Sequence, residues 1–268
     1  MIAEARVNGL DLHYRIDGPE GGAPWVTFSN SLATDLSLWD GQVAELAARF
    51  RVLRYDTRGH GGSAASDPPY DFAQLEADVI GLWDALGIER SHYVGLSLGG
   101  STGVGLAINH PARVASLAAC DCRVTSPPEF RRAWEGRIGM VEEGGTEAVV
   151  EDTMARWFTA PTLAAGGPAM ERIRRMIRET SADGFIGCAR ALQGIEYLEA
   201  AEAINCPTLI VVGEKDPAAT PALAGALHWR IRGSRLVELP DAAHISNIEN
   251  AGAFNAALVP FLETVADG

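Results

Sequence analysis

The sequence predicts an α/β fold in which a mostly parallel sheet is covered by helices on both faces and one long helical insertion interrupts the pattern. Short β-rich runs alternate with helical patterns in the first half of the chain, and this alternation lapses between Arg123 and Asn205. A hydrophobic content of 47% over 268 residues is sufficient for one large core. We therefore expect one α/β core that carries an insertion.

The N-terminal part of the chain predicts strands on either side of a crossover helix. Apolar residues alternate along Val7–Asp17, which indicates two strands paired as a hairpin around Asn8-Gly9. Trp25–Phe28 and Arg51–Tyr55 are short β-rich runs bounded by loops. Between them, Leu38–Phe50 has apolar residues at helical spacing. The chain thus begins with a hairpin and then builds a crossover unit.

A second crossover and four more strands complete the predicted sheet. The helical pattern Leu75–Leu86 ends at Gly87, a residue type that favours helix C-termini. The further strands are His92–Leu96, Val114–Cys120, Thr208–Val212 and Arg235–Leu239. Strands that alternate with helices form parallel sheets covered on both faces. With the hairpin, the sequence predicts eight strands.

The helical insertion is expected to form four helices. Ser126-Pro127-Pro128-Glu129 resembles a capping box with proline at the first helical position. Thr146 can cap a second helix, Gly166-Gly167-Pro168 opens a third, and Phe185–Leu192 is a fourth. We divide the chain into a core, residues 1–122 and 206–268, and a lid, residues 123–205. In such folds the lid lies over the carboxyl ends of the strands, where ligands bind.

Composition argues against several classes of partner. A net charge of −13 disfavours nucleic acids and anionic membranes as partners. The N-terminus has no basic segment followed by an apolar run, and no stretch approaches the length of a membrane span, so we expect a cytoplasmic protein. The four cysteines are then reduced thiols. Cys120-Asp121-Cys122 has no matching second Cys or His pair, and we expect no metal site.

Gly95-Leu96-Ser97-Leu98-Gly99 is the motif that indicates chemistry. It follows a predicted strand and precedes a helix rich in small residues, which is the context of a nucleophile elbow. The two glycines lack side chains that would collide with the neighbouring strand and helix. Ser97 would project from the sheet, beside the first amides of the new helix, which favour negative charge. We therefore predict that Ser97 is a nucleophile.

A serine nucleophile needs a base and an orienting carboxylate. His244 follows the last predicted strand in a loop and can reach the rim of the sheet, whereas His13, His92 and His110 are more simply explained as structural. Asp216 follows the Thr208–Val212 strand and is our predicted acid. Asp121 also ends a strand, so it remains an alternative acid. For the oxyanion we predict the backbone amides of Leu98 and of Leu32, the latter in the loop after Trp25–Phe28.

With these residues in place, the chain resembles the α/β-hydrolases and, among them, the 3-oxoadipate enol-lactonases. The general resemblance covers nearly all of the chain outside the insertion and includes the loop Asp56–Ser63, which makes His60 a structural residue. The closer resemblance rests on Ser29-Asn30-Ser31-Leu32 with Thr34-Asp35 and Trp39, on Arg156-Trp157-Phe158-Thr159, on Asp216-Pro217-Ala218-Ala219-Thr220-Pro221, and on His244-Ile245-Ser246-Asn247-Ile248-Glu249.

The resemblance implies an α/β-hydrolase fold and the hydrolysis of 3-oxoadipate enol-lactone to 3-oxoadipate, a step of aromatic-compound catabolism, with no metal or organic cofactor. A carboxylesterase, another lactonase or a carbon–carbon hydrolase remains the alternative, and a non-catalytic ligand-binding homologue is a further one. Two positions depart from the family. Ala33 replaces a usual glycine, which we expect to be tolerated if the loop keeps a negative φ, and Asp121–Thr125 replaces the usual Asn-Thr-Ala run.

An anionic substrate would need a cationic group in the pocket of so acidic a protein. Arg123 is the first candidate because it adjoins a strand end. The other candidates are Arg131, Arg132, Arg137 and Arg190. Asn30, Ser31, Trp134 and Trp157 are further predicted substrate contacts, although helix packing explains the two tryptophans equally well. The sequence predicts a small-molecule substrate and leaves open whether the protein is a monomer or a homo-oligomer.

Overall fold

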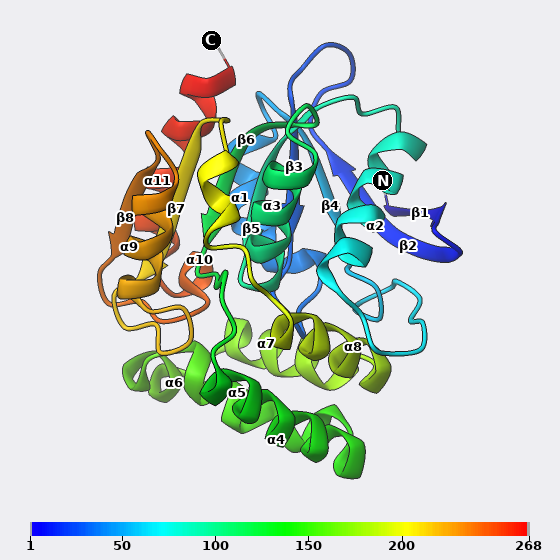
Figure 1. Cartoon of the computed structure of the whole chain (residues 1–268), viewed down its shortest axis with the longest axis vertical. Coiled ribbons are helices and arrows are strands. Elements are labelled where there is room, and N and C mark those ends of the chain that lie inside the picture. The colour runs from blue at the N-terminus through cyan, green and yellow to red at the C-terminus, as the bar shows by residue number, and fades with distance from the viewer. Residues whose placement is uncertain (1, 267–268) are drawn as a thin grey trace.

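The computed structural model describes residues 2–266 and is built on one eight-stranded sheet (Figure 1). Its strands are β1 (Ile2–Val7), β2 (Leu10–Asp17), β3 (Trp25–Ser29), β4 (Arg51–Tyr55), β5 (Ser91–Leu96), β6 (Val114–Cys120), β7 (Thr208–Gly213) and β8 (Arg235–Leu239). The spatial order is β1-β2-β4-β3-β5-β6-β7-β8. The β1–β2 and β2–β4 pairs are antiparallel, and the others are parallel. The predicted fold class is confirmed.

Helices pack on both faces of the sheet and bury two apolar layers. One face carries α2 (Phe72–Ala85), α3 (Leu98–Asn109) and α9 (Pro221–Arg230), and the other carries α1 (Asp40–Leu46) and α11 (Ala251–Ala266). Trp39 is fully buried, with its ring 4.7 Å from Phe28 and 6.1 Å from Phe254. Burying an aromatic ring of this kind contributes roughly 3 kcal/mol. Such contacts make the sheet a rigid base for the residues at its carboxyl end.

The first crossover helix is shorter than predicted. A single helix was expected over Leu38–Phe50, whereas the structure has a 3₁₀ turn, η1 (Leu36–Trp39), followed by α1, which ends at Leu46. Asp35 caps the 3₁₀ turn by accepting from the Ser37 amide at 2.8 Å. Phe50 nevertheless remains buried. The apolar spacing predicted the buried side chains correctly. Phe50, however, lies in a turn after the helix, where its amide donates to the Leu46 carbonyl.

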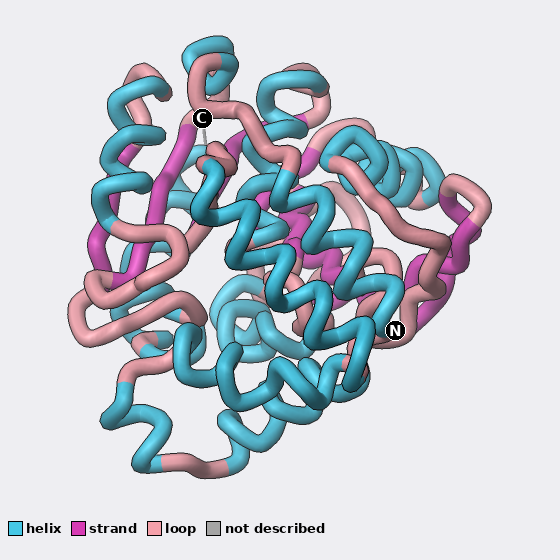
Figure 2. Tube along the Cα trace, turned by 60° about the horizontal axis from the view of Figure 1, so that its bottom comes forward, coloured by secondary structure: helices cyan, strands magenta, loops and turns pink. Residues whose placement is uncertain are grey.

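The helical insertion follows β6, as predicted. It contains α4 (Pro128–Gly144), η2 (Thr146–Val149), α5 (Val150–Trp157), α6 (Ala160–Ala165), α7 (Pro168–Glu179) and α8 (Ala182–Gln193), with η3 (Ala200–Ala203) leading back toward β7. Figure 1 shows α4–α8 gathered at one end of the sheet, and Figure 2 turns this end toward the viewer, with helices in front of the strands. The core and lid boundaries at 122/123 and 205/206 stay a prediction.

Two predicted helix caps in the insertion are wrong, and one helix was missed. The capping box at Ser126 does not form, because Pro127 is extended before Pro128 and itself occupies the N-cap position. Ser126 Oγ instead accepts from Arg131 Nε at 3.4 Å. Thr146 caps no helix, since its hydroxyl donates to the Arg178 and Thr180 carbonyls. The helix α6 was not predicted.

The remaining sequence expectations concern cysteines and membrane spans. Cys120, Cys122, Cys188 and Cys206 are all free thiols. Within residues 2–266, no helix has the length and apolar character needed to cross a membrane. In the same part of the chain, no group of three His, Cys, Asp or Glu side chains is arranged to hold a metal ion.

Candidate active site

Ser97 occupies a tight turn between β5 and α3. β5 ends at Leu96 and α3 begins at Leu98, so one residue makes the whole turn, with φ 56° and ψ −114°. A Cβ on Gly95 would lie 2.2 Å from the Gly99 carbonyl oxygen, and one on Gly99 would lie 2.3 Å from the Ser29 carbonyl oxygen. Only glycine fits at either position. The strained turn therefore directs the Ser97 side chain away from the sheet.

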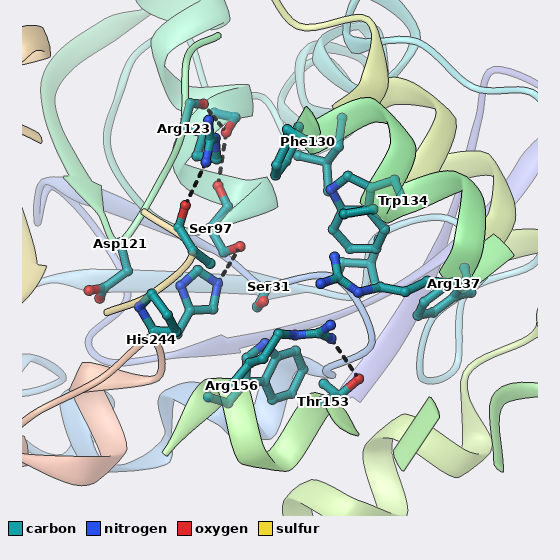
Figure 3. A pocket seen from close by; sticks show the side chains of 18 of the residues that line it. Ser31, Ser97, Asp121, Arg123, Phe130, Trp134, Arg137, Thr153, Arg156 and His244 are labelled. Carbon is teal, nitrogen blue, oxygen red and sulfur yellow. Dashed lines mark hydrogen bonds between the residues drawn. The ribbon is translucent and has the colours of Figure 1, made fainter. Parts of the chain in front are cut away.

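His244 joins Ser97 to Asp216 through two hydrogen bonds. Its Nε2 lies 2.8 Å from Ser97 Oγ, and its Nδ1 lies 2.8 Å from Asp216 Oδ2 (Figure 3). The other oxygen, Asp216 Oδ1, accepts from the Ala218 and Ala219 amides at 2.7 and 3.0 Å. An ionised carboxylate can only accept, so His244 Nδ1 carries a proton and Nε2 is free to take one from Ser97.

Asp121 lies close to this group but makes no contact with His244. Its Oδ1 accepts from the Gly213 amide at 2.8 Å, and its Oδ2 accepts from Ser246 Oγ at 2.5 Å. It thereby ties the end of β7 to the segment that follows His244. Burial, and after it the charge of Asp216, raises the pKa of the Asp121 carboxyl well above its usual value. Of the two candidate acids, Asp216 is the one in contact with the histidine.

The loop after β3 and the start of α3 present two free amides beside Ser97. Within residues 2–266, neither the Leu32 nor the Leu98 amide donates to a backbone acceptor. The two segments are joined by the Gly99 amide, which donates to the Asn30 carbonyl at 3.0 Å. The expectation of a negative φ at Ala33 is wrong, because φ is 61°. The Thr34 amide donates to the Ser31 carbonyl and closes a turn in which Ala33 has a left-handed conformation. For a residue with a side chain this conformation costs roughly 1 kcal/mol.

A cavity of about 300 Å³ opens above Ser97. Its floor consists of residues on the core, namely Ser31, Leu32, Ser97, Asp121 and His244. Its roof consists of residues on α4, α5 and α8, namely Glu129, Phe130, Ala133, Trp134, Arg137, Thr153, Arg156, Trp157, Phe185 and Leu192 (Figure 3). Of the predicted substrate contacts, Arg123, Ser31, Trp134 and Trp157 line the cavity. Asn30 does not, because its side chain is buried and donates to the Tyr55 carbonyl.

Comparison with known proteins places the chain in a family. The model of the alpha/beta hydrolase fold family matches residues 24–251. The chain belongs to the α/β-hydrolase family. It is 35% identical to the 3-oxoadipate enol-lactonase 2 of Acinetobacter baylyi, over 92% of this chain and 91% of that one. It is also 30% identical to a putative carbamate hydrolase RutD of a Caulobacter species, over 96% of each chain.

Among solved structures, this α/β-hydrolase is similar to the enol-lactonase of Burkholderia xenovorans LB400. The two share 44% sequence identity with a TM-score of 0.94, over 97% of this chain and all of that one. A hydrolase from Pseudomonas aeruginosa is 35% identical with a TM-score of 0.93, over 97% of this chain and 98% of that one. The predicted resemblance to the α/β-hydrolases, with the enol-lactonases as similar members, is confirmed.

The cavity of this hydrolase holds two arginines that the chain does not neutralise fully. Arg137 has neither an ion pair nor a hydrogen bond among residues 2–266, and its guanidinium lies 4.8 Å from the Trp134 ring centre. Burial, and then the positive charge of Arg156, lowers the pKa of Arg137 to about 10. Arg156 bonds to Asp152 and Thr153, and burial lowers its pKa too. Two half-buried cations side by side favour an anionic ligand.

The other candidate arginines either bind other groups of the chain or lie outside the cavity. Arg123 lines the cavity wall, but its Nη1 donates to the Ala218 carbonyl at 2.9 Å and its guanidinium lies 4.2 Å from the Phe130 ring centre. Arg131 pairs with Glu196 at 3.1 Å, and Arg190 pairs with Glu135. Arg132 is exposed on α4 and does not line the cavity.

Arg156 is a charged lining residue that was not predicted from the sequence. The motif Arg156–Thr159 was noted without any chemical role for its arginine. A signal was present, because Thr153, Arg156 and Trp157 share one face of α5, and Phe130, Trp134 and Arg137 share one face of α4. Mixed aromatic and cationic residues at this spacing would have indicated two helices that face a polar cavity.

Two of the lining residues carry a buried polar atom without a partner in the described part of the chain. The Ser31 hydroxyl and the Trp134 indole nitrogen are both buried and make no hydrogen bond among residues 2–266. Buried donors are rarely left unpaired, because each costs about 1–3 kcal/mol. Both residues line the cavity, Ser31 at the floor and Trp134 at the roof.

Proposed function

We propose that this protein is a serine hydrolase that opens a small enol-lactone bearing a carboxylate, with 3-oxoadipate enol-lactone as the substrate and 3-oxoadipate as the product. The observation that carries the proposal is the hydrogen-bonded sequence Ser97–His244–Asp216 beneath a cavity whose roof holds Arg137 and Arg156. The reacting bond and the substrate charge thus find complementary groups at opposite sides of the same cavity.

Acylation follows from the positions of the floor residues. Ser97 Oγ attacks the lactone carbonyl carbon while His244 Nε2 accepts the serine proton. Asp216 stabilises the imidazolium that forms, through its bond to Nδ1. The tetrahedral oxyanion accepts from the Leu32 and Leu98 amides, which have no competing protein acceptor in the described chain. Donors that are fixed before the reaction lower its barrier without reorganisation.

Ring opening and hydrolysis complete the cycle. The bond between the acyl carbon and the ring oxygen breaks, and His244 gives its proton to the departing enol oxygen. The enol tautomerises to the ketone, which makes the step effectively irreversible. His244 then takes a proton from water as the water oxygen attacks the acyl-enzyme, and it returns that proton to Ser97 as the acid leaves. The net reaction consumes one water and needs no cofactor.

The substrate carboxylate is proposed to bind Arg137 and Arg156. A guanidinium can hold a carboxylate with two hydrogen bonds, and a partly desolvated pair of this kind is stronger than a surface ion pair. The helical insertion, residues 123–205, acts as the lid that supplies these arginines and excludes water from the cavity. The name of the Acinetobacter baylyi relative, an enol-lactonase, supports the choice of substrate class.

A substrate panel tests the proposal. Specificity constants are measured for 3-oxoadipate enol-lactone, for neutral lactones of similar size, for a p-nitrophenyl ester and for a simple carbamate. We expect the carboxylate-bearing lactone to be preferred, and Ser97→Ala to abolish turnover of every substrate. A preference of tenfold or more for neutral esters, about 1.4 kcal/mol in transition-state binding, would replace the enol-lactonase by an esterase. Absence of all turnover by folded protein would leave only a ligand-binding homologue.

A further inference from the structure

The last residues of two sequence motifs, Thr159 and Glu249, have no part in the proposed mechanism and meet in the structure. Thr159 follows α5 in the insertion, and Glu249 ends α10 (Ser246–Glu249), shortly after His244. Glu249 Oε1 accepts from the Thr159 amide at 2.8 Å and from the Thr159 hydroxyl at 2.7 Å. Glu249 Oε2 accepts from the Ala243 amide at 2.7 Å. One carboxylate therefore joins the insertion to the residue immediately before His244.

The residue immediately after His244 is joined to the same part of the insertion. The Ile245 amide donates to the Trp157 carbonyl at 3.2 Å. The Trp157 ring also lies beside the His244 ring, with centroids 6.4 Å apart and planes inclined by 32°. Both backbone amides that flank the histidine are thus engaged, one directly by the insertion and the other through Glu249.

These contacts act on a loop that must be accurately positioned. His244 lies between β8 and α10, outside regular structure, and it has to contact Ser97 and Asp216 at the same time. Displacing a reacting group by about 1 Å can cost roughly a hundredfold in rate. Glu249 itself does not line the cavity, so it cannot contact the substrate there. Its hydrogen bonds reach the base through the Ala243 amide and reach the insertion through Thr159.

We propose that Glu249 is a positioning residue: together with the Trp157–Thr159 segment it holds His244 where it can accept the Ser97 proton. The inference rests on the proposed roles of Ser97 and His244. It also gives the insertion a second task, because the segment that closes the cavity fixes the base. The junction of α5 and α6 then stays on the core during turnover, and substrate enters elsewhere along the roof.

Three variants test this inference, and each has a defined chemical effect. In Glu249→Gln, an amide NH₂ replaces one acceptor oxygen, so the side chain can no longer accept from both the Ala243 and the Thr159 amides. Thr159→Val keeps the shape and the backbone amide but removes the hydroxyl, which donates to Glu249 Oε1 and also lies 3.1 Å from the Thr162 hydroxyl. Thr146→Val is the matched control, since the Thr146 hydroxyl also bonds within the insertion, to the Arg178 and Thr180 carbonyls, but has no link to His244.

The readouts are the rate of Ser97 labelling by a fluorophosphonate and the kcat and KM for p-nitrophenyl acetate. We expect labelling and kcat to fall by about tenfold or more in Glu249→Gln and by about threefold to tenfold in Thr159→Val, with KM nearly unchanged. In the double variant the two effects should not multiply, because both break the same connection. Thr146→Val should change labelling by less than about twofold.

The outcomes separate this inference from the proposed function. If wild-type labelling is rapid and depends on Ser97, but Glu249→Gln and Thr159→Val react like wild type, the positioning role is wrong and the proposed function stands. An equal loss in Thr146→Val would also overturn it, because the effect would then be general loosening of the insertion. No Ser97-dependent labelling of the wild type would overturn both. If Glu249→Gln fails to fold, Thr159→Val decides.

Discussion

The floor and the roof of the cavity are built in different ways. On the floor, Ser97, Asp216 and His244 lie on short turns at the ends of strands, and hydrogen bonds of 2.7–3.0 Å connect them to one another and to the backbone. On the roof, Trp134 and Arg137 project from helices, and both leave donors without protein partners. The catalytic side chains of the floor are thus held by one another and by the backbone, whereas the roof presents in Arg137 a charge that no side chain among residues 2–266 pairs with.

The largest expected effect comes from the floor. Asp216→Asn replaces an acceptor of the His244 Nδ1 proton by an amide and favours the wrong tautomer, so we expect kcat to fall by about 10³–10⁴. Asp121→Asn should change kcat by less than about threefold, because Asp121 contacts Gly213 and Ser246 but not His244. Steady-state kinetics and thermal unfolding of both variants make the comparison. A severe loss of kcat in Asp121→Asn with a normal kcat in Asp216→Asn would show that Asp121, and not Asp216, is the acid that orients His244.

The second-largest effect is a loss of stability at low pH that we expect from His60, next to a contact between the core and the insertion. The Ser181 amide, which precedes α8, donates to the Gly59 carbonyl, and a Cβ on Gly59 would lie 2.4 Å from Gly184 Cα. The neighbouring His60 is fully buried, and burial lowers the pKa of its imidazole from 6.5 to about 4. His60 is therefore neutral in the folded protein at pH values where the unfolded chain already binds a proton.

The sign of the pH effect follows from this difference. Above pH 6.5 His60 is neutral in both states and has no effect. As the pH falls from 6.5 to 4, His60 binds a proton in the unfolded state but not in the folded state. The free energy of unfolding therefore falls by up to about 3 kcal/mol. Urea unfolding at pH 7 and pH 4.5 measures the loss, and His60→Gln should reduce its slope by about one proton. An unchanged slope would mean that His60 is protonated within the fold.

The floor could be predicted from the sequence because its groups are fixed by local chain geometry. Gly95 and Gly99 indicate a turn at which only glycine fits. Asp216 and His244 follow strands whose carboxyl ends must lie at one edge of the sheet. Two details of the loop after β3 were predicted wrongly. The turn from Ser31 to Thr34 forces a positive φ on Ala33, a residue that gives no local sign of it, and the Asn30 side chain is buried against Tyr55 instead of lining the cavity.

The roof could be predicted only in outline. Helix existence followed from apolar spacing and from Gly144-Gly145 and Gly166-Gly167, but the side chains that face the cavity depend on how α4 and α5 rotate against the core. Arg123 was favoured because it adjoins a strand end. In the folded chain its guanidinium turns to the Ala218 carbonyl instead, a contact across 95 positions that no local pattern reveals.

The third prediction tests the roof directly. Arg137→Leu removes the cation that lacks a protein partner, and we expect KM for the carboxylate-bearing lactone to rise about thirtyfold, roughly 2 kcal/mol, with little change for neutral esters. Thermal stability should not fall, because an unpaired half-buried charge is unfavourable in the free protein. Arg131→Leu is the matched control on the same helix, since Arg131 is exposed and paired with Glu196. Equal effects in the two variants would show that only the overall charge matters.

The smallest effect is expected at Arg123, which lies in the cavity wall between floor and roof. Its guanidinium is held by the Ala218 carbonyl and by the face of Phe130, and the Ala218 amide in turn donates to Asp216 Oδ1. In Arg123→Gln the lost hydrogen bond should lower stability by about 1 kcal/mol and kcat by less than about threefold. The preference for carboxylate-bearing over neutral substrates should stay the same, because the charge at Arg137 and Arg156 is untouched. A loss of that preference in Arg123→Gln, measured on the same substrate panel, would move the anion site from the roof to the wall.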